Sequence, residues 1–174
     1  ALTRAKKTFD TGNINDSIVE HENIVTRYPE NAIVYYNLGR IYKVNEVYDS
    51  AVLNYRKASE LNPFEVKYQK AIKAIAQEMT SNGDIEFRRQ EFDSAIKYYN
   101  NAINYSPSYT TALFKLARTY FKIKEYTHAK YYLEHNLAVD SNQEQSEKML
   151  GDIYRKMGDL DAAVEHYNKA ITIN

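Results

Sequence analysis

The sequence predicts an all-α protein made of helix pairs that repeat along the chain. Three observations support this fold class. The 174 residues include only five glycines and three prolines, which are too few turn formers for an all-β protein. Apolar residues recur at spacings of three, four and seven, and these spacings place them on one face of a helix. The same spaced pattern also returns at a fixed period along the chain.

The clearest copy of the pattern lies in residues 32–65. Its signature residues are Leu38, Gly39, Tyr42, Ala51, Tyr55, Ala58 and Pro63. Small residues at Gly39 and Ala51 let two helices approach closely, while Tyr42 and Tyr55 fill the space beside that contact. The stretch VNEVYD between the two apolar stripes predicts a turn, so this repeat is expected to be helix, turn, helix.

Other copies follow in residues 76–109, 110–143 and 144–174, and a weaker one precedes them in residues 1–31. Their signature residues are Gly83, Ala95, Tyr99, Ala102 and Pro107; Ala129; and Gly151, Tyr154, Ala163, Tyr167 and Ala170. The copy at 110–143 has diverged at its end, where Asn136 and Ser141 replace the alanine and proline. Prolines at the ends of repeats predict breaks between successive helix pairs.

Residues 66–75 are an insertion between two repeats. No helix breaker lies between Phe64 and Ser81, so we expect the insertion to extend the next helix to about 24 residues, or about 36 Å, beyond its neighbours. An apolar stripe runs along it through Phe64, Tyr68, Ile72, Ile75 and Met79. This stripe needs a partner, which could be the preceding repeat, a second copy of the chain or another protein.

The repeated pattern resembles the tetratricopeptide repeat family, with its 34-residue unit and its Leu-Gly, Tyr, Ala, aromatic, Ala and Pro positions. The resemblance covers five units and the insertion, and implies one array over residues 1–174. It also implies a right-handed superhelical solenoid of antiparallel helix pairs. Pentatricopeptide repeats of RNA-binding proteins are similar in length, but they lack the paired alanines and the Leu-Gly pattern. Solenoids of this kind commonly bind partners on the concave surface that their first helices line.

By analogy with the family, the groove-facing positions of the first helices carry nine basic and three acidic residues, although the whole chain has no net charge. The candidate groove residues are Tyr36, Arg40, Lys43, Phe87, Arg88, Phe114, Arg118, Phe121, Lys122 and Arg155. Basic groups among aromatics favour a protein or peptide partner with acidic side chains or a free C-terminus. Alternatively, the aromatics only close contacts between adjacent helices, and the charges are a solvated face.

A more specific family feature, the carboxylate clamp of some co-chaperones, fits poorly. Only Asn37 matches a clamp position in the best register, and Leu2, Gln77 and Ser81 cannot supply the charge that the clamp needs. RNA binding is also disfavoured, because the chain lacks net positive charge and a dense basic patch.

Enzymatic and metal-dependent functions find little support in the sequence. There is no cysteine, and no HExxH, GxSxG or phosphate-binding glycine loop. His128 and His135 could share a helix face, but no further ligands accompany them. We therefore expect a non-catalytic protein without a cofactor or metal. No apolar run reaches the roughly 20 residues that a membrane span requires, and the compartment stays open between cytoplasm and periplasm.

Self-assembly is a second class of function. The sequence stops after Ala170 and Ile171 without the polar capping helix that solenoids normally carry, and it starts abruptly at Leu2. The exposed ends are expected to be covered by further chain or by a neighbouring molecule. The stripe of the inserted helix offers another surface for oligomer formation.

Overall fold

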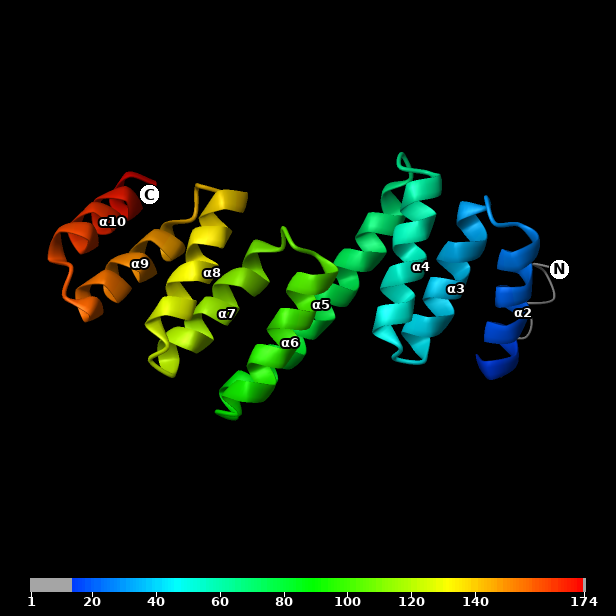
Figure 1. Cartoon of the computed structure of the whole chain (residues 1–174), viewed down its shortest axis with the longest axis horizontal. Helices are drawn as coiled ribbons and strands as arrows, with labels where there is room; N and C mark the ends of the chain where they lie inside the picture. Colours follow the sequence, from blue (N-terminus) through cyan, green and yellow to red (C-terminus); the bar gives the residue numbers. More distant parts are fainter. Residues whose placement is uncertain (1–13, 174) are drawn as a thin grey trace. The chain divides into compact units, whose positions relative to one another are not determined.

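The computed structural model describes residues 14–173, and helices are the regular elements throughout that range (Figure 1). Their bounds are α2 (Ile14–Arg27), α3 (Ala32–Val44), α4 (Tyr48–Leu61), α5 (Val66–Arg88), α6 (Phe92–Tyr105), α7 (Thr110–Lys122), α8 (Tyr126–Val139), α9 (Glu144–Met157) and α10 (Leu160–Ile173). The described residues contain no strand, so the all-α prediction is confirmed. Leu2 and the rest of the predicted first helix lie outside them.

The chain divides into two compact units, Ala1–Ile75 and Ala76–Asn174. The boundary falls within α5, whose 23 residues confirm the predicted long helix. The first unit contains α2, α3, α4 and the inserted residues 66–75, and the second contains the rest of α5 and the helices α6 to α10. A single array over residues 1–174 stays a prediction.

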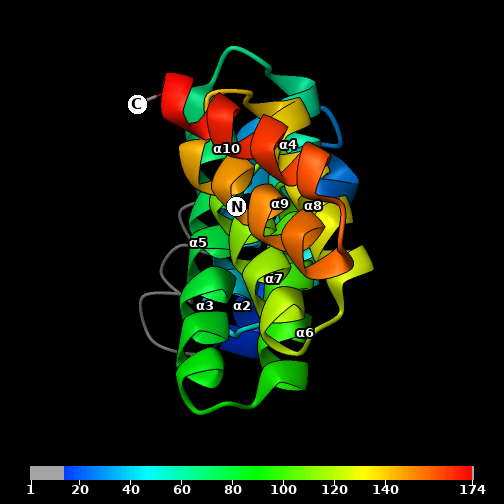
Figure 2. The same ribbon diagram turned by 90° about the vertical axis from the view of Figure 1, so that its left-hand side faces the viewer.

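The helix pairs formed by residues 32–173 are closed by the same kind of turn. The residues Glu46, Gln90, Lys124 and Gly158 occupy equivalent places in four repeats and have positive φ angles of 59°, 63°, 68° and 86°. In the first of these turns, the amide of Val47 donates back to the carbonyl of Tyr42 at 2.9 Å. This is the Schellman arrangement, which satisfies the last carbonyls of a helix and reverses the chain. The paired helices α7 and α8, and α9 and α10, therefore lie side by side in both views (Figures 1 and 2).

The predicted close approach at glycine is confirmed in three helix pairs. A Cβ on Gly39 would lie 2.7 Å from the ring of Tyr55, and a Cβ on Gly83 would lie 2.5 Å from the ring of Tyr99. Gly151 meets Tyr167 in the same way, also at 2.5 Å. Such distances are shorter than any real Cβ contact, so the tyrosine ring occupies the space that a side chain would need.

The three prolines lie in turns between successive helix pairs, as predicted. Pro29, Pro63 and Pro107 each follow the end of a second helix, and Ser141 occupies a bend at the equivalent place in the diverged repeat. Proline can neither donate a backbone hydrogen bond nor continue a helix, so these residues set the length of each repeat.

The inserted residues pack against the preceding helix pair within the first unit. The ring of Tyr68 lies 5.3 Å from the ring of Tyr36, and Gln69 donates to the hydroxyl of Ser59 at 2.8 Å. Tyr68, Ile72 and Ile75 are at most 4% exposed. Of the three partners expected for this stripe, the preceding repeat is the one observed. Tyr68, Ile72 and Ile75 are buried within the chain and do not overhang it, so they offer no oligomer surface.

Phe64 does not belong to the stripe, contrary to the prediction. It lies in the turn before α5 and is 94% exposed, because the helix begins only at Val66. A residue outside the helix does not follow the helical period, so its spacing from Tyr68 placed it wrongly on the stripe.

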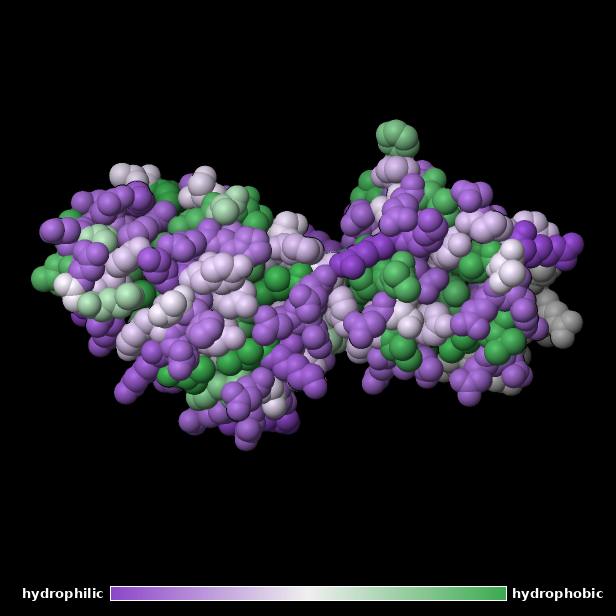
Figure 3. All heavy atoms as spheres, in the orientation of Figure 1, coloured by the Kyte–Doolittle hydropathy of each residue, from purple (hydrophilic) through white to green (hydrophobic). Residues whose placement is uncertain are grey.

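The second unit has a continuous apolar core. One cluster contains Ala95, Tyr99 and Leu116, and another contains Ala117, Ala129, Leu133, Leu150 and Ile153. On the face that Figure 3 presents, polar side chains dominate and apolar ones form small separate groups. Within residues 14–173, no helix has both the length and the apolar character needed to cross a membrane.

Candidate functional site

The second unit brings charged residues of successive first helices together on one surface. We call this surface the first-helix face and define it by Asp84 and Phe87 on α5, Lys115 and Arg118 on α7, and Asp152 and Arg155 on α9. Asp84, Arg118 and Asp152 are 34 residues apart and occupy the same place in three consecutive repeats. The charge at this place therefore alternates along the face.

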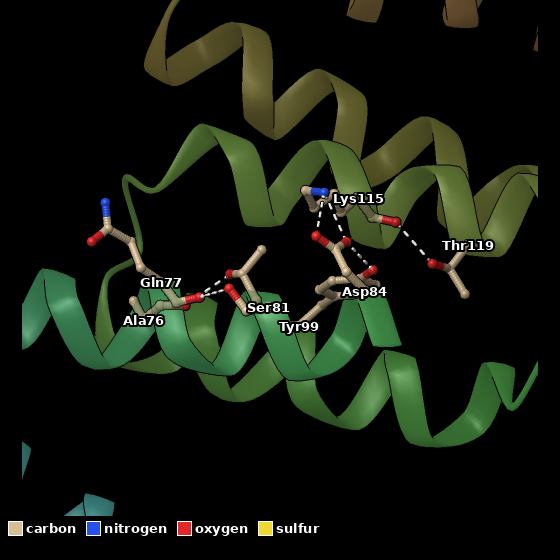
Figure 4. A network of polar contacts seen from close by, with 8 residues as sticks. Ala76, Gln77, Ser81, Asp84, Tyr99, Lys115 and Thr119 are labelled. Atoms are coloured by element: carbon tan, nitrogen blue, oxygen red, sulfur yellow. Dashed lines mark hydrogen bonds and ion pairs between the residues drawn. The ribbon is translucent and has the colours of Figure 1, made fainter. Parts of the chain in front are cut away.

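Asp84 is held from two helices. Its two carboxylate oxygens accept from the Nζ of Lys115 at 2.7 Å each, and one of them also accepts from the hydroxyl of Tyr99 at 2.8 Å (Figure 4). The side chains of Lys115 and Asp84 are 23% and 33% exposed, so this ion pair is partly shielded from water. It links α5 to α7, while the tyrosine links α5 to α6.

Tyr99 is fully buried, but its hydroxyl reaches this polar cluster. Burial raises the pKa of Tyr99, the hydrogen bond to Asp84 raises it further, and the positive charge of Arg118 partly offsets the rise. The guanidinium of Arg118 is therefore close enough to act on the same hydroxyl.

Asp152 repeats the arrangement of Asp84 two repeats later. One of its oxygens accepts from the hydroxyl of Tyr167 at 2.8 Å and from the guanidinium of Arg155 at 3.1 Å. Arg155, a predicted groove residue, is thus paired within its own helix. The two aspartates of the first-helix face are both occupied by internal partners.

Arg118 differs from the other charges of this face. Its Cζ lies 4.6 Å from the centroid of the Phe87 ring, a cation–π contact between α7 and α5. Its Nε is buried and has no hydrogen-bond partner. Among residues 14–173, Arg118 forms no ion pair. The structure thus brings together Phe87 and Arg118, two of the predicted residues.

The remaining predicted residues of the second unit are of two kinds. Arg88 and Lys122 are exposed. Phe114 and Phe121 are half-buried and pack against the cluster that contains Ala117. Both phenylalanines therefore use part of their surface to close helix contacts, as the alternative interpretation of the sequence stated, and only the rest faces outward.

In the first unit, Tyr36 is packed between two buried rings, at 5.5 Å from Tyr55 and 5.3 Å from Tyr68. The Nζ of Lys67 lies 5.6 Å from the centroid of the Tyr36 ring. Arg40 is exposed and Lys43 is half-buried. Because insertion residues cover Tyr36, this part of the predicted groove is occupied mainly by the chain itself.

Sequence reasoning missed two features. Lys115 was not among the expected groove residues, although its pairing with Asp84 dominates the face. Glu147, only 8% exposed, occupies the place that Leu113 has in the preceding repeat, and it binds His166 at 2.6 Å. A glutamate at an apolar position of the repeat is a signal that could have revealed this pair, because a buried carboxylate needs a partner.

The histidines outside this pair show no metal-site geometry. His128 stacks on Tyr120 and lies 3.4 Å from Glu125. Within residues 14–173, no group of three or more histidine, aspartate or glutamate side chains is arranged to hold a metal ion.

Comparison with known proteins agrees with the observed architecture. Three models of the tetratricopeptide repeat match residues 32–65, 83–124 and 145–174, and together these segments cover more than half of the chain. Among curated proteins, Anaphase-promoting complex subunit 3 of Schizosaccharomyces pombe is 24% identical over 136 residues, which is 78% of this chain. The chain spans only 19% of the length of that relative.

Solved structures with the same arrangement include MamA, with a TM-score of 0.56 and 21% identity over 97% of this chain and 93% of that one. YrrB, described as a TPR protein with an unusual peptide-binding site, has a TM-score of 0.54 and 18% identity over 98% and 82% of the two chains. The second TPR of Spaghetti (RPAP3), bound to an HSP90 peptide, covers 59% of this chain and 94% of its own, with a TM-score of 0.56 and 19% identity. At these identities the likeness shows the fold. Helix pairs closed by Schellman turns, glycine against tyrosine, and three matching family models lead to one conclusion: the chain belongs to the tetratricopeptide repeat family.

Proposed function

We propose that this chain is a protein-interaction scaffold, a non-catalytic adaptor that holds a segment of a partner protein against the first-helix face of its second unit. The observation that carries this proposal is the imbalance of free charge on that face. Asp84 and Asp152 are held by internal hydrogen bonds and ion pairs, whereas Arg118 has no anionic partner among the described residues.

Two exposed cations strengthen this imbalance. Arg88 follows Phe87 on α5, and Lys122 lies one helical turn beyond Arg118 on α7. Long-range attraction from such a cluster speeds the encounter with an acidic segment, and the outward surfaces of Phe87 and Phe121 offer apolar contact. A segment with acidic and apolar side chains therefore suits this surface.

The relatives support a binding role without identifying a partner. RPAP3 is described with a bound HSP90 peptide and YrrB with a peptide-binding site. The same fold serves many unrelated assemblies, so the choice of partner depends on the side chains of this chain.

The test is selection of peptides from a random library of 12-residue sequences displayed on phage, using the whole chain as bait. The variant Arg118→Glu/Lys122→Glu should lose the selected peptides. Lys122 is exposed and contributes little to folding, whereas Arg118 is half-buried against Phe87, so thermal melting must establish that the variant folds like the parent. The matched control is Lys57→Glu/Lys97→Glu, which makes the same change of charge on second helices. Equal binding by all three proteins, or no enrichment by the parent, would exclude the proposal.

Self-association through α10 is a second candidate, supported by one observation. Leu160, Val164 and Ile171 are 64%, 58% and 73% exposed on this helix. Equivalent residues of the repeat at 76–109, such as Ile96 and Ile103, are half-buried. If copies associate here, light scattering should show a mass that rises with concentration and that Val164→Lys/Ile171→Lys restores to a monomer. A constant monomer mass for the parent would exclude this candidate.

A further inference from the structure

On the first-helix face, the two aspartates have charged partners within the chain, whereas Arg118 has none among the residues that the structure describes. Asp84 is neutralised by Lys115, and Asp152 by Arg155, and each aspartate also accepts from a tyrosine hydroxyl. Arg118 occupies the equivalent place in the repeat between them and forms no ion pair within residues 14–173. This face therefore has one shielded cation without an anion.

The guanidinium of Arg118 is already held in position. Its contact with Phe87, 4.6 Å from Cζ to the ring centroid, restricts the side chain, so less side-chain entropy remains to be lost on binding. Its buried Nε has no acceptor, and burial of a charged donor without an acceptor is unfavourable. An anion at the terminal nitrogens would supply the charge that the unit itself does not.

We propose that Arg118 binds the side-chain carboxylate of an aspartate or glutamate within an extended partner segment. This inference rests on the proposed function and adds the chemistry of recognition to it. A planar guanidinium offers two parallel N–H donors that match the two oxygens of a carboxylate, and a stacked arginine cannot be replaced by lysine without losing this geometry.

The surroundings favour a side-chain carboxylate over the carboxylate at a chain terminus. A terminal carboxylate is held by several cationic and amide donors around one point, but Lys115, the nearest cation in sequence, is engaged by both oxygens of Asp84. Asp84 and Asp152 flank Arg118 at the same place in the neighbouring repeats. Both aspartates already have a cation within the chain, so neither place offers a free positive charge to a second acidic residue. The partner segment should therefore carry one acidic residue at this point rather than an acidic run.

The first experiment compares the peptides that the parent, Arg118→Gln, Arg118→Lys and Lys97→Gln select from the 12-residue library. The parent and Lys97→Gln, the matched control on α6, should enrich peptides with aspartate or glutamate at one fixed position. Arg118→Gln should lose that preference, and Arg118→Lys should retain it only weakly. Circular dichroism and thermal melting establish that all four proteins fold alike. If Arg118→Gln is unstable, Arg118→Lys carries the comparison.

The second experiment uses one selected peptide made with its acidic residue or with the neutral amide. The neutral peptide should bind the parent at least about tenfold more weakly, and both peptides should bind Arg118→Gln equally. If the neutral peptide binds both the parent and Arg118→Gln more weakly than the acidic peptide by the same factor, the carboxylate binds elsewhere. That result would overturn this inference while the proposed function stands, whereas absence of any enriched peptide would overturn both.

A third comparison separates the two sources of carboxylate. The same peptide is synthesised with a free and with an amidated C-terminus, and both forms should bind the parent with the same affinity. A loss of about tenfold or more on amidation would assign the carboxylate to the chain end and overturn the proposed side-chain contact.

Discussion

The repeats at 76–109 and 110–143 use different side chains for the same helix contact. In the first, Gly83 leaves a space that the ring of Tyr99 fills, with only 2.5 Å between the ring and the place of a Cβ. In the second, Ala117 and Leu133 occupy the equivalent places, and both are fully buried in one cluster. The total volume is shared differently, but both pairs leave the helices closely packed.

The difference reaches the surface. Tyr99 ends in a hydroxyl that needs an acceptor, and Asp84 supplies it. Leu133 has no polar group and needs no acceptor. In its repeat the place equivalent to Asp84 is therefore not required to carry a carboxylate, and Arg118 occurs there. Within the second unit, a tyrosine in the core thus goes with a neutralised carboxylate on the first-helix face, and a leucine goes with a free guanidinium. The repeat at 32–65 combines Tyr55 with Arg40, so the core residue alone does not fix this charge.

The largest loss of stability is expected when the alanine at Ala117 of the repeat at 110–143 is placed at the equivalent Gly83 of the repeat at 76–109. Gly83→Ala forces a Cβ into the Tyr99 ring and should destabilise the chain by about 3 kcal/mol. Adding Tyr99→Leu recreates the pair of the next repeat, so the double variant should lose less than the sum of the single ones, with about 1–3 kcal/mol of coupling. Urea unfolding measures all three proteins.

The reciprocal change controls for this result. Leu133→Tyr should crowd Ala117 and destabilise the chain, and Ala117→Gly should then restore part of the loss. If the losses of the single variants simply add in both double variants, the Gly83–Tyr99 and Ala117–Leu133 pairs are not coupled.

The next effect concerns Asn136, which stands where the other repeats carry alanine. It is fully buried, donates to the carbonyl of Thr110 at 2.6 Å and accepts from the hydroxyl of Ser146 at 3.1 Å. Asn136→Ala brings the repeat closer to the family pattern, yet should destabilise the chain by about 2 kcal/mol, because it leaves two buried polar groups without partners. Unfolding at or above the stability of the parent would contradict this account.

A smaller effect is expected from removing the hydroxyl that distinguishes the two repeats. Tyr99→Phe should destabilise the chain by about 1 kcal/mol, because Asp84 keeps its ion pair with Lys115. Tyr131→Phe, at a ring that is 61% exposed in the middle repeat, serves as the control and should change stability little. Denaturant titration of both variants tests this, and equal losses would deny the hydroxyl of Tyr99 a special role.

The smallest expected effect is a decrease of the free energy of unfolding at alkaline pH. Burial raises the pKa of Tyr55, the tyrosine that contacts Gly39, to about 12. The unfolded chain ionises near pH 10, so this stabilisation is complete below pH 10 and is lost as the pH rises through about 12.

At pH 10 the loss should be below about 1 kcal/mol, and Tyr55→Phe should lose less between pH 8 and pH 10.5 than the parent. Unfolding titrations at both pH values provide the measurement. The equivalent place in the repeat at 110–143 contributes nothing of this kind, because Leu133 does not ionise. If the stability of the parent and of Tyr55→Phe depends on pH in the same way, Tyr55 is not the cause of the alkaline loss.

Much of the fold followed from local patterns. The spacing of Leu38, Gly39 and Tyr42 predicted a helix and its packing face, because the helical period depends on the backbone alone. The prolines predicted the repeat boundaries, since a missing N–H ends a helix in any context. The pattern failed at Phe64, which lies in the turn before α5 and is exposed. It placed Tyr68, Ile72 and Ile75 on one face but left their partner open, because the neighbouring helices decide what buries them.

The candidate site was predictable only in part. Arg118 and Phe87 were expected on the groove, and the structure brings them together across 31 residues of sequence. Lys115 was missed, because a pairing between α5 and α7 depends on how the two helices align rather than on the period of either one. The sequence therefore could not show which charged residues of the first-helix face remain without an ion-pair partner.

By itself, the sequence determined the helical repeat, its turns and the glycine that each tyrosine requires, because these depend on the period of one helix and the size of one side chain. Only the tertiary structure decided which charges of the first-helix face are occupied. Asp84 and Asp152 are held by neighbours that packing brings near them, and Arg118 is not. The physical reason is that ion pairing acts over a few ångströms in space, whatever the separation along the chain.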